Sequence, residues 1–116
     1  NLELAIKALK NLQKLAPQHD AHLFSLARIY RKQNDYISAQ KFIEEAHHIA
    51  PKNIPIVIEW LTIALDAAQS TVLKAQDRKR AQKNARKALD ALQAISPNHP
   101  AKKIFNEKLE LIEQAT

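Results

Sequence analysis

The densest group of positively charged side chains that could bind a ligand lies in one short stretch of the sequence. Between positions 74 and 87 there are seven Lys or Arg residues and one carboxylate, Asp77. The formal net charge of the whole chain is +6, so the excess of positive charge is concentrated here. Such a density of cations favours an anionic partner: an acidic protein segment, a lipid headgroup or a nucleic acid. This basic stretch consists of Lys74, Arg78, Lys79, Arg80, Lys83, Arg86 and Lys87.

The plainest interpretation of the basic stretch is a solvated helix face, and among binding functions an acidic protein segment is favoured. No aromatic residue lies between Val72 and Ile95, so the stacking platform used in binding single-stranded nucleic acid is missing. Near its start only Val72 and Leu73 are bulky and apolar, which is too little for a lipid-facing stripe. Nucleic acid and membrane are therefore disfavoured as partners.

Residues for catalysis or metal binding are sparse. The chain has no Cys and no Gly, which excludes thiol nucleophiles, disulfides and glycine-rich phosphate loops. His19, Asp20 and His22 resemble a metal-binding trio, but Asp20 is better placed as a helix cap and no further strong ligand accompanies the histidines. His47 and His48 are expected at a helix end, where polar groups suit the dipole. We predict no catalytic residue, no metal, no cofactor and no enzymatic activity.

The elements that carry these residues repeat along the chain. The unit Ala-x3-apolar-x5-apolar-x-Pro occurs three times and ends at Pro17, Pro51 and Pro97. The first two copies are 34 residues apart, and the third follows after 46. Within each copy the apolar residues recur at spacings of three and four, which predicts an amphipathic helix ended by the proline. Self-similarity at this period predicts an all-α stack of helical pairs.

A partner helix is predicted over residues 20–33, with Asp20 as its N-cap and a turn at Asn34 in the left-handed conformation. Its predicted buried stripe consists of Leu23, Leu26, Ala27 and Tyr30. In the helices that precede the three prolines, the predicted buried residues are Ala5, Leu9, Leu12, Ala39, Phe42, Ile43, Ala46, Ala85, Ala88, Leu89 and Leu92.

Residues 20–53 resemble a tetratricopeptide repeat, whose pattern is W-x2-L-G-x2-Y…A-x3-F…P. The resemblance implies an α-α superhelix of about two and a half repeats, cut from a longer protein. One domain would then contain the second helix of a truncated repeat (1–19), a full repeat (20–53), an extended repeat (54–98) and a capping helix (99–116). The residues that match the pattern are Leu23, Leu26, Ala27, Tyr30, Ala39, Ile43, Ala46 and Pro51.

The extended repeat departs from the pattern by twelve inserted residues and leaves two registers open. The preferred register aligns Trp60 with the start of the signature. The alternative aligns Val57 and puts bulky Leu61 where a small residue belongs. Its first helix is expected to start at Pro55. The inserted residues should lengthen the helices around 69–71 instead of forming a long loop, because the stretch is rich in helix formers. Trp60 is expected to fill the core.

The resemblance also implies a concave groove, lined by the first helix of each pair, that binds a peptide or helix of another protein. Phe24 lies beside the predicted buried stripe and near Arg28 and Arg31, which suits an apolar anchor with acidic flanks. Alternatively, Phe24 packs against the next helix. The predicted groove residues are Phe24, Arg28, Arg31, Lys32, Ile58, Thr62 and Leu65.

Family members that hold the acidic tails of chaperones use a Lys followed four residues later by an Asn. Here those positions are Phe24 and Arg28, so chaperone-tail binding is disfavoured. We therefore expect a scaffold or adaptor module for protein–protein interaction. The alternatives are an anion- or membrane-surface-binding module through 74–87, and a structural spacer or self-association module that forms homo-oligomers through exposed repeat ends. No apolar run approaches the ~18 residues of a membrane span. The compartment stays open, because a chain without Cys survives in either redox environment.

Overall fold

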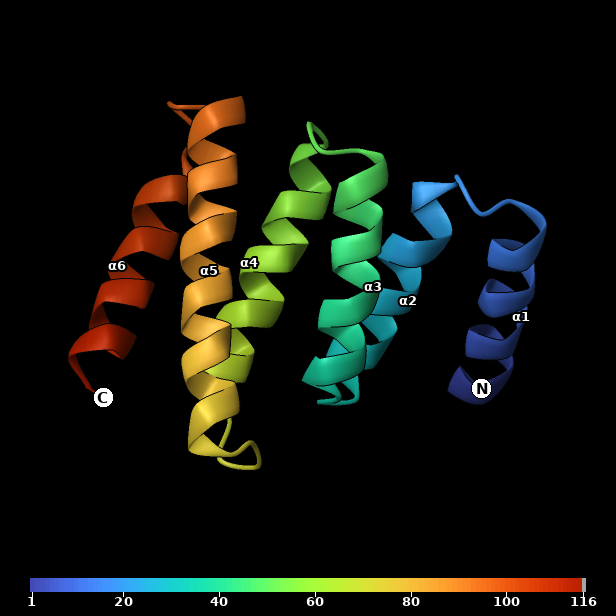
Figure 1. Ribbon diagram of the computed structural model, residues 1–116, viewed down its shortest axis with the longest axis horizontal. Helices are drawn as coiled ribbons and strands as arrows, with labels where there is room; N and C mark the ends of the chain where they lie inside the picture. The colour runs from blue at the N-terminus through green and yellow to red at the C-terminus, as the bar shows by residue number, and fades with distance from the viewer. Residues whose placement is uncertain (116) are drawn as a thin grey trace. The chain divides into compact units, whose positions relative to one another are not determined.

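The computed structural model describes residues 1–115, which form six α-helices and, within that range, no β-strand (Figure 1). The all-α class predicted from the sequence is confirmed. Helices that are adjacent in sequence pack together: α1 on α2, α2 on α3, and α5 on α6, as in an α-α repeat fold. The helices are α1 (Leu2–Leu15), α2 (Asp20–Lys32), α3 (Tyr36–Ile49), α4 (Ile54–Ala68), α5 (Ala75–Ile95) and α6 (Ala101–Gln114).

The three prolines of the sequence repeat are preceded by the same backbone geometry. The helices α1, α3 and α5 end in cap residues with φ of −135°, −129° and −144° and ψ of 72°, 71° and 80°. A following proline disfavours the helical conformation, which explains these non-helical values. Each cap carbonyl then accepts a hydrogen bond, at 3.0–3.1 Å, from the N–H three residues later: Ala16 from His19, Ala50 from Asn53, and Ser96 from His99. The sequence repeat is therefore also a repeat of local structure.

The chain divides into two compact units, Asn1–Glu59 and the part from Trp60 onward, with the boundary inside α4. In the first unit, α2 contacts both α1 and α3. The predicted stripes of α2 and α3 are largely confirmed, while Tyr30 and Phe42 are only partly buried and stack on each other with ring centroids 5.5 Å apart. The buried residues are Leu23, Leu26, Ala27, Ala39, Ile43 and Ala46.

The helix α1 differs from its predicted packing. None of its residues is fully buried: Ala5 and Leu9 are partly covered, and Leu12 is 44% exposed. The physical reason is that α1 packs on a single neighbour, α2, and one helix covers only part of an apolar stripe.

The turn between α2 and α3 follows the prediction. Asn34 has a positive φ of 63°, which confirms the left-handed conformation expected where Gly would otherwise stand. Asp35 then caps α3, because its Oδ1 accepts a hydrogen bond from the Ser38 N–H at 3.1 Å. Three residues are thus enough to reverse the chain between the two helices.

Two predicted helix starts are corrected. Asp20 is the first residue of α2 and not its cap, and its carboxylate Oδ2 accepts a hydrogen bond from Asn53 Nδ2 at 3.5 Å. The helix α4 begins at Ile54, one residue before Pro55, because Asn53 caps it. The Oδ1 atom of Asn53 accepts from the Ile56 N–H at 3.2 Å. Asn53 therefore both starts α4 and contacts the start of α2.

The twelve inserted residues are distributed over helices and loop. Compared with α2 and α3, α4 has 15 residues instead of 13, and α5 has 21 instead of 14. The connecting loop has six residues, 69–74, instead of three. Most of the insertion lengthens the helices on either side of residues 69–71, as predicted, and the remainder lengthens the loop.

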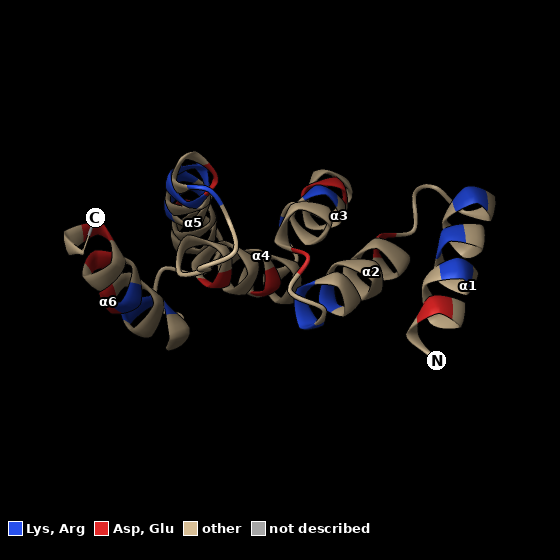
Figure 2. Ribbon diagram, turned by 90° about the horizontal axis from the view of Figure 1, so that it is seen from below, with Lys and Arg blue, Asp and Glu red and all other residues tan. Residues whose placement is uncertain are grey.

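The second unit has a core of its own. Figures 1 and 2 place the second half of α4 beside α5, and α6 packs on α5. The predicted stripe of α5 is confirmed, and Trp60, 8% exposed, belongs to the core as expected. The buried residues of this unit are Trp60, Leu61, Ile63, Ala64, Leu65, Ala67, Ala68, Ala81, Ala85, Ala88, Leu89, Leu92, Leu109 and Ile112.

Candidate functional site: two interaction surfaces

The first surface follows α2 in the N-terminal unit. Phe24 is half-buried, and the guanidinium carbon of Arg28 lies 5.6 Å from the centre of its ring, within the range of a cation–π contact. Lys32, exposed, follows one turn further along. Residues four apart lie on the same side of a helix, so α2 presents an aromatic side chain followed by two cations. We call Phe24, Arg28 and Lys32 the α2 surface.

A small cavity of about 240 Å³ opens beside Phe24. It lies between the first turn of α2 and the start of α4, where Ile56 and Pro55 form the opposite wall. Its volume is below the roughly 300–1,000 Å³ of small-molecule sites, so it suits a single apolar side chain better than a cofactor. The remaining lining residues are Asp20, Ala21 and Asn53.

A buried carboxylate, Glu59, accounts for one of the predicted groove cations. Glu59 is 7% exposed, and its Oε2 lies 2.5 Å from Nε of Arg31. The Arg31 Nη2 atom donates to Oε1 at 3.5 Å, and Nε of Arg28 lies 3.8 Å from the same oxygen. Arg31 is therefore engaged within the protein, which corrects its predicted role as a groove cation. Arg28, with a side chain 49% exposed, still reaches solvent.

Sequence reasoning missed Glu59, although a signal for it was present. Glu59 and Asp66 are the only charged residues in the otherwise apolar segment 54–68. A carboxylate in a helix that is apolar on nearly all sides is expected to be buried, and a buried charge requires a partner of opposite sign. The cations of α2 were the available partners.

The other predicted groove residues are distributed over both units. Ile58 belongs to the first unit and is half-buried, and Thr62, in the second, is also half-buried. Leu65 contradicts the prediction, because it is only 5% exposed and belongs to the core. The reason is again the composition of α4, whose apolar residues cover more than one stripe of the helix.

The second surface is the basic stretch, which lies in the C-terminal unit on Lys74 and the first half of α5 (Figure 2). Two of its arginines have partners close in sequence. The Arg78 Nη1 atom donates to the carbonyl of Leu73 in the preceding loop. The Arg80 Nη1 atom lies 3.8 Å from Oδ1 of Asp77, an exposed pair.

Arg86 has a different role, because it connects α5 to α6. Its Nη1 atom donates to Asn106 Oδ1 at 3.2 Å, and its Nη2 atom donates to Glu113 Oε1 at 2.8 Å. The side chains of Arg86 and Glu113 are 41% and 40% exposed. Arg86 is therefore engaged within the fold, and its assignment to the binding patch stays a prediction.

Four lysines of the basic stretch remain directed to solvent. All four are exposed, and within residues 1–115 none of their side chains forms a hydrogen bond or an ion pair. Three of them, at positions 79, 83 and 87, are spaced four apart and so follow one side of α5. We call Lys74, Lys79, Lys83 and Lys87 the lysine row.

The histidines form no metal-binding group. The rings of His19 and His22 stack with centroids 4.6 Å apart, and no three metal-ligating side chains cluster anywhere in residues 1–115. Burial lowers the pKa of His47 from its ordinary value of 6.5. The neighbouring His48 lowers this pKa further, and a backbone hydrogen bond at Pro51 opposes the shift. Within the same residues, every helix is too short or too polar to cross a bilayer.

Comparison with known proteins gives no family assignment, since no family model matches the chain and no curated protein matches it. The interpretation of function therefore depends on the α2 surface and the lysine row. The first combines an apolar cavity with cations, whereas the second offers positive charge alone.

Proposed function

We propose that this chain is a protein–protein interaction module of the tetratricopeptide type and that its α2 surface binds an extended segment of another protein. The observation that carries the proposal is the apolar cavity beside Phe24, which is followed along the same helix by Arg28 and Lys32. Two observations support the repeat type. The same turn recurs at Pro17, Pro51 and Pro97, and residues 20–53 match the repeat pattern. A binding module, and not an enzyme, also suits a chain without Cys or Gly.

The geometry of α2 sets the pattern of the bound segment. An apolar side chain of the partner inserts beside Phe24, against Ile56, and acidic side chains pair with Arg28 and Lys32. An α-helix rises about 1.5 Å per residue, so Phe24 and Lys32 lie about 12 Å apart along the axis. An extended chain spans at most about 3.3–3.6 Å per residue. The partner should therefore carry its acidic residues within about four positions of its apolar anchor.

A selection from a random peptide library displayed on phage tests this proposal. The parent protein should enrich peptides with one large apolar residue and one or two acidic residues at that distance. Selection in parallel on Phe24→Ala should lose the apolar preference, and selection on Arg28→Ala with Lys32→Ala should lose the acidic one. Peptides of unrelated pattern, or the same peptides on all three proteins, would refute the α2 surface as the binding site.

The lysine row favours a second candidate function, the binding of an acidic protein segment by α5. Two facts support this candidate. Lys74, Lys79, Lys83 and Lys87 are exposed, and no acidic side chain in the described part of the chain pairs with them. Exposed charges of one sign steer association and are screened beyond about 8–10 Å at physiological ionic strength.

Polyglutamate is a simple probe for this second candidate. The parent should bind it at low salt and lose affinity as salt rises. Changing Lys79, Lys83 and Lys87 to Gln should weaken binding and flatten its salt dependence. Unchanged binding by this variant would mean that the lysine row is only a solvated face. Equal or tighter binding of the parent to single-stranded DNA or to anionic vesicles would count against an acidic protein as the partner.

A further inference from the structure

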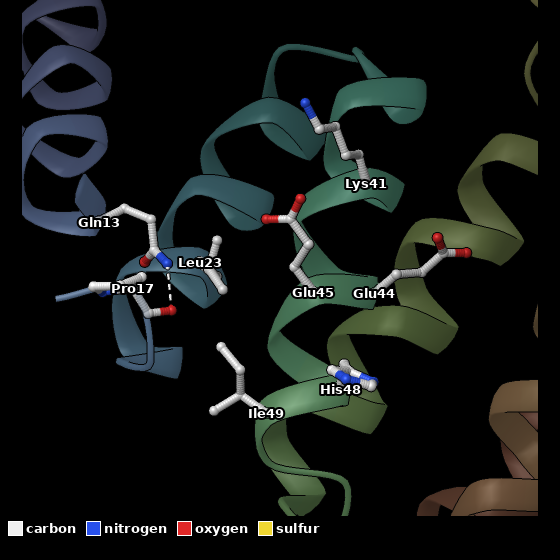
Figure 3. A pocket seen from close by; sticks show the side chains of 8 residues that line it. All are labelled: Gln13, Pro17, Leu23, Lys41, Glu44, Glu45, His48 and Ile49. Carbon is white, nitrogen blue, oxygen red and sulfur yellow. Dashed lines mark hydrogen bonds between the residues drawn. The ribbon is translucent and has the colours of Figure 1, made fainter.

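We propose that a second binding site, between α1 and α3, holds an arginine side chain of a partner protein. A cavity of about 470 Å³ opens there, lined by the end of α1, the following turn, the first half of α2 and the outer side of α3 (Figure 3). Its residues are distinct from those of the α2 surface, so the inference is independent of the proposed function. We call it the α1–α3 pocket.

The floor of the α1–α3 pocket is apolar. Leu23, 1% exposed, forms its base, with Pro17 on one side and Ile49 on the other. In Figure 3 the side chains of Leu23 and Ile49 extend into the space between α1 and α3. Such a floor fits the aliphatic stem of a long cationic side chain, which gains from apolar contact while its charged head stays at the rim.

A hydrogen-bond acceptor is left without a donor at one wall of the α1–α3 pocket. The Nε2 atom of Gln13 donates to the carbonyl of Pro17 at 2.8 Å, which fixes the orientation of the amide. Its Oε1 atom is buried and has no hydrogen-bond partner in the described structure. A buried polar atom without a partner costs about 1–3 kcal/mol, so a ligand donor that displaces the groups covering Oε1 would be stabilising.

A carboxylate faces the same space from α3. The side chain of Glu45 points from α3 toward the α1 side of the pocket (Figure 3), is exposed, and pairs with no described residue. The adjacent Glu44 behaves differently. Glu44 also lines the pocket, but its carboxylate points to the other side of α3 and accepts a hydrogen bond from Gln40 Nε2 at 2.7 Å. Glu45 is thus the acid that a ligand in the pocket would meet.

The protein's own nearby lysines are held by aromatic rings. The Nζ atom of Lys41, one turn before Glu45, lies 5.5 Å from the centre of the Phe42 ring. The Nζ atom of Lys10 lies 5.8 Å from the centre of the Tyr30 ring, and these two rings stack on each other. Lys41 also lines the pocket, but neither its ammonium group nor that of Lys10 forms an ion pair with Glu45 within residues 1–115.

Arginine fits this combination better than other cationic side chains. Its planar guanidinium presents five N–H donors, so it can meet the Glu45 carboxylate and a second acceptor together. It is more weakly hydrated than an ammonium group and tolerates an apolar floor.

Nuclear magnetic resonance titration with N-acetyl-arginine methylamide tests the proposal. The uncharged N-acetyl-citrulline methylamide and the N-acetyl-lysine methylamide serve as comparison probes. The arginine probe should cause saturable shifts at the amides of Gln13, Leu23 and Ile49. The citrulline probe should cause none, and the lysine probe should bind more weakly.

Variants of the two adjacent acids then separate a specific site from general attraction. Glu45→Gln should weaken binding of the arginine probe by roughly threefold to tenfold, the effect of losing one charge-assisted contact. Glu44→Gln, with the same change in net charge, should bind as the parent does. The proposal is overturned by equal weakening in both variants, by equal binding of the lysine or citrulline probe, or by shifts that map elsewhere. The Glu45 side chain is exposed, so Glu45→Gln should leave the fold intact. An amide spectrum of the free variant that matches the parent spectrum will show that it is folded.

Discussion

Among single residues, Glu59 links the fold most closely to the α2 surface. Its carboxylate joins Arg31 and Arg28 of α2 to α4 within the first unit. Arg28 also contacts the ring of Phe24, so the position of the aromatic anchor depends on a chain of side-chain contacts that begins at Glu59. A buried pair of this kind is costly to break, because removal of one charge leaves the other without compensation.

We predict that Glu59→Gln lowers the free energy of unfolding by about 1–3 kcal/mol. The effect should lie below that of a fully buried pair, because the Arg31 side chain is 23% exposed and can regain water. Urea titration followed by the fluorescence of Trp60, the only tryptophan, measures it. The exposed Glu44→Gln is the control and should stay within about 0.5 kcal/mol of the parent. Equal stability of the two variants would show that the Glu59 pair is energetically neutral.

At His47, the lowered pKa makes stability depend on pH. Burial is the main cause, so the folded protein resists protonation of this ring while the unfolded chain takes up a proton near 6.5. Below that pH the unfolded state binds more protons, and the free energy of unfolding falls as pH decreases. We expect this loss between about pH 7.5 and about pH 5.5, and a shallower loss in His47→Gln. Superimposable pH profiles of the two proteins would contradict the assignment.

Among the elements, α5 combines a structural role with an exposed surface. Arg78 contacts the preceding loop and Arg86 contacts α6, whereas the lysines of α5 are exposed to solvent. Arginine presents several donors in a fixed plane and so suits contacts with two acceptors, such as Asn106 and Glu113. Arg78 and Arg86 are therefore engaged within the fold, and the lysines are not.

We predict that Arg86→Gln loosens α6, with a cost of about 1 kcal/mol, because two charge-assisted hydrogen bonds to a half-exposed side chain are lost. Hydrogen–deuterium exchange should become faster in Ala101–Gln114 and stay unchanged in α2 and α3. Lys83→Gln, one turn earlier on α5, should leave the exchange of α6 unaffected. The distinction between arginines and lysines fails if both variants alter α6 alike.

Features that depend on neighbouring residues in the sequence were predicted correctly, whereas features that depend on tertiary packing were not. Helix ends before proline and the left-handed turn at Asn34 follow from local backbone preferences, and both were predicted. The exposure of α1, the burial of Leu65 and the pairing of Glu59 depend on which helix lies opposite. Periodicity marks an apolar face but does not say how much of it a neighbour covers, and so these features were missed.

At the scale of the whole molecule, the same turn recurs after α1, α3 and α5 within residues 1–115. Because each turn is fixed by a local sequence, the helices between the turns can lengthen, as α4 and α5 do, without loss of the pattern. The α2 surface, the α1–α3 pocket and the lysine row share no residue.

The most direct test of the central proposal is calorimetric titration of a peptide selected on the parent into Phe24→Ala, with thermal melting of the same samples. We predict a loss of about 2 kcal/mol or more in binding free energy, which is typical of a truncated aromatic anchor, with a smaller loss of folding stability. Ile37→Ala, which removes an apolar side chain 65% exposed on α3, should bind as the parent does. Unchanged affinity in Phe24→Ala, or a loss of folding near the roughly 3–5 kcal/mol of a core phenylalanine, would contradict the proposal.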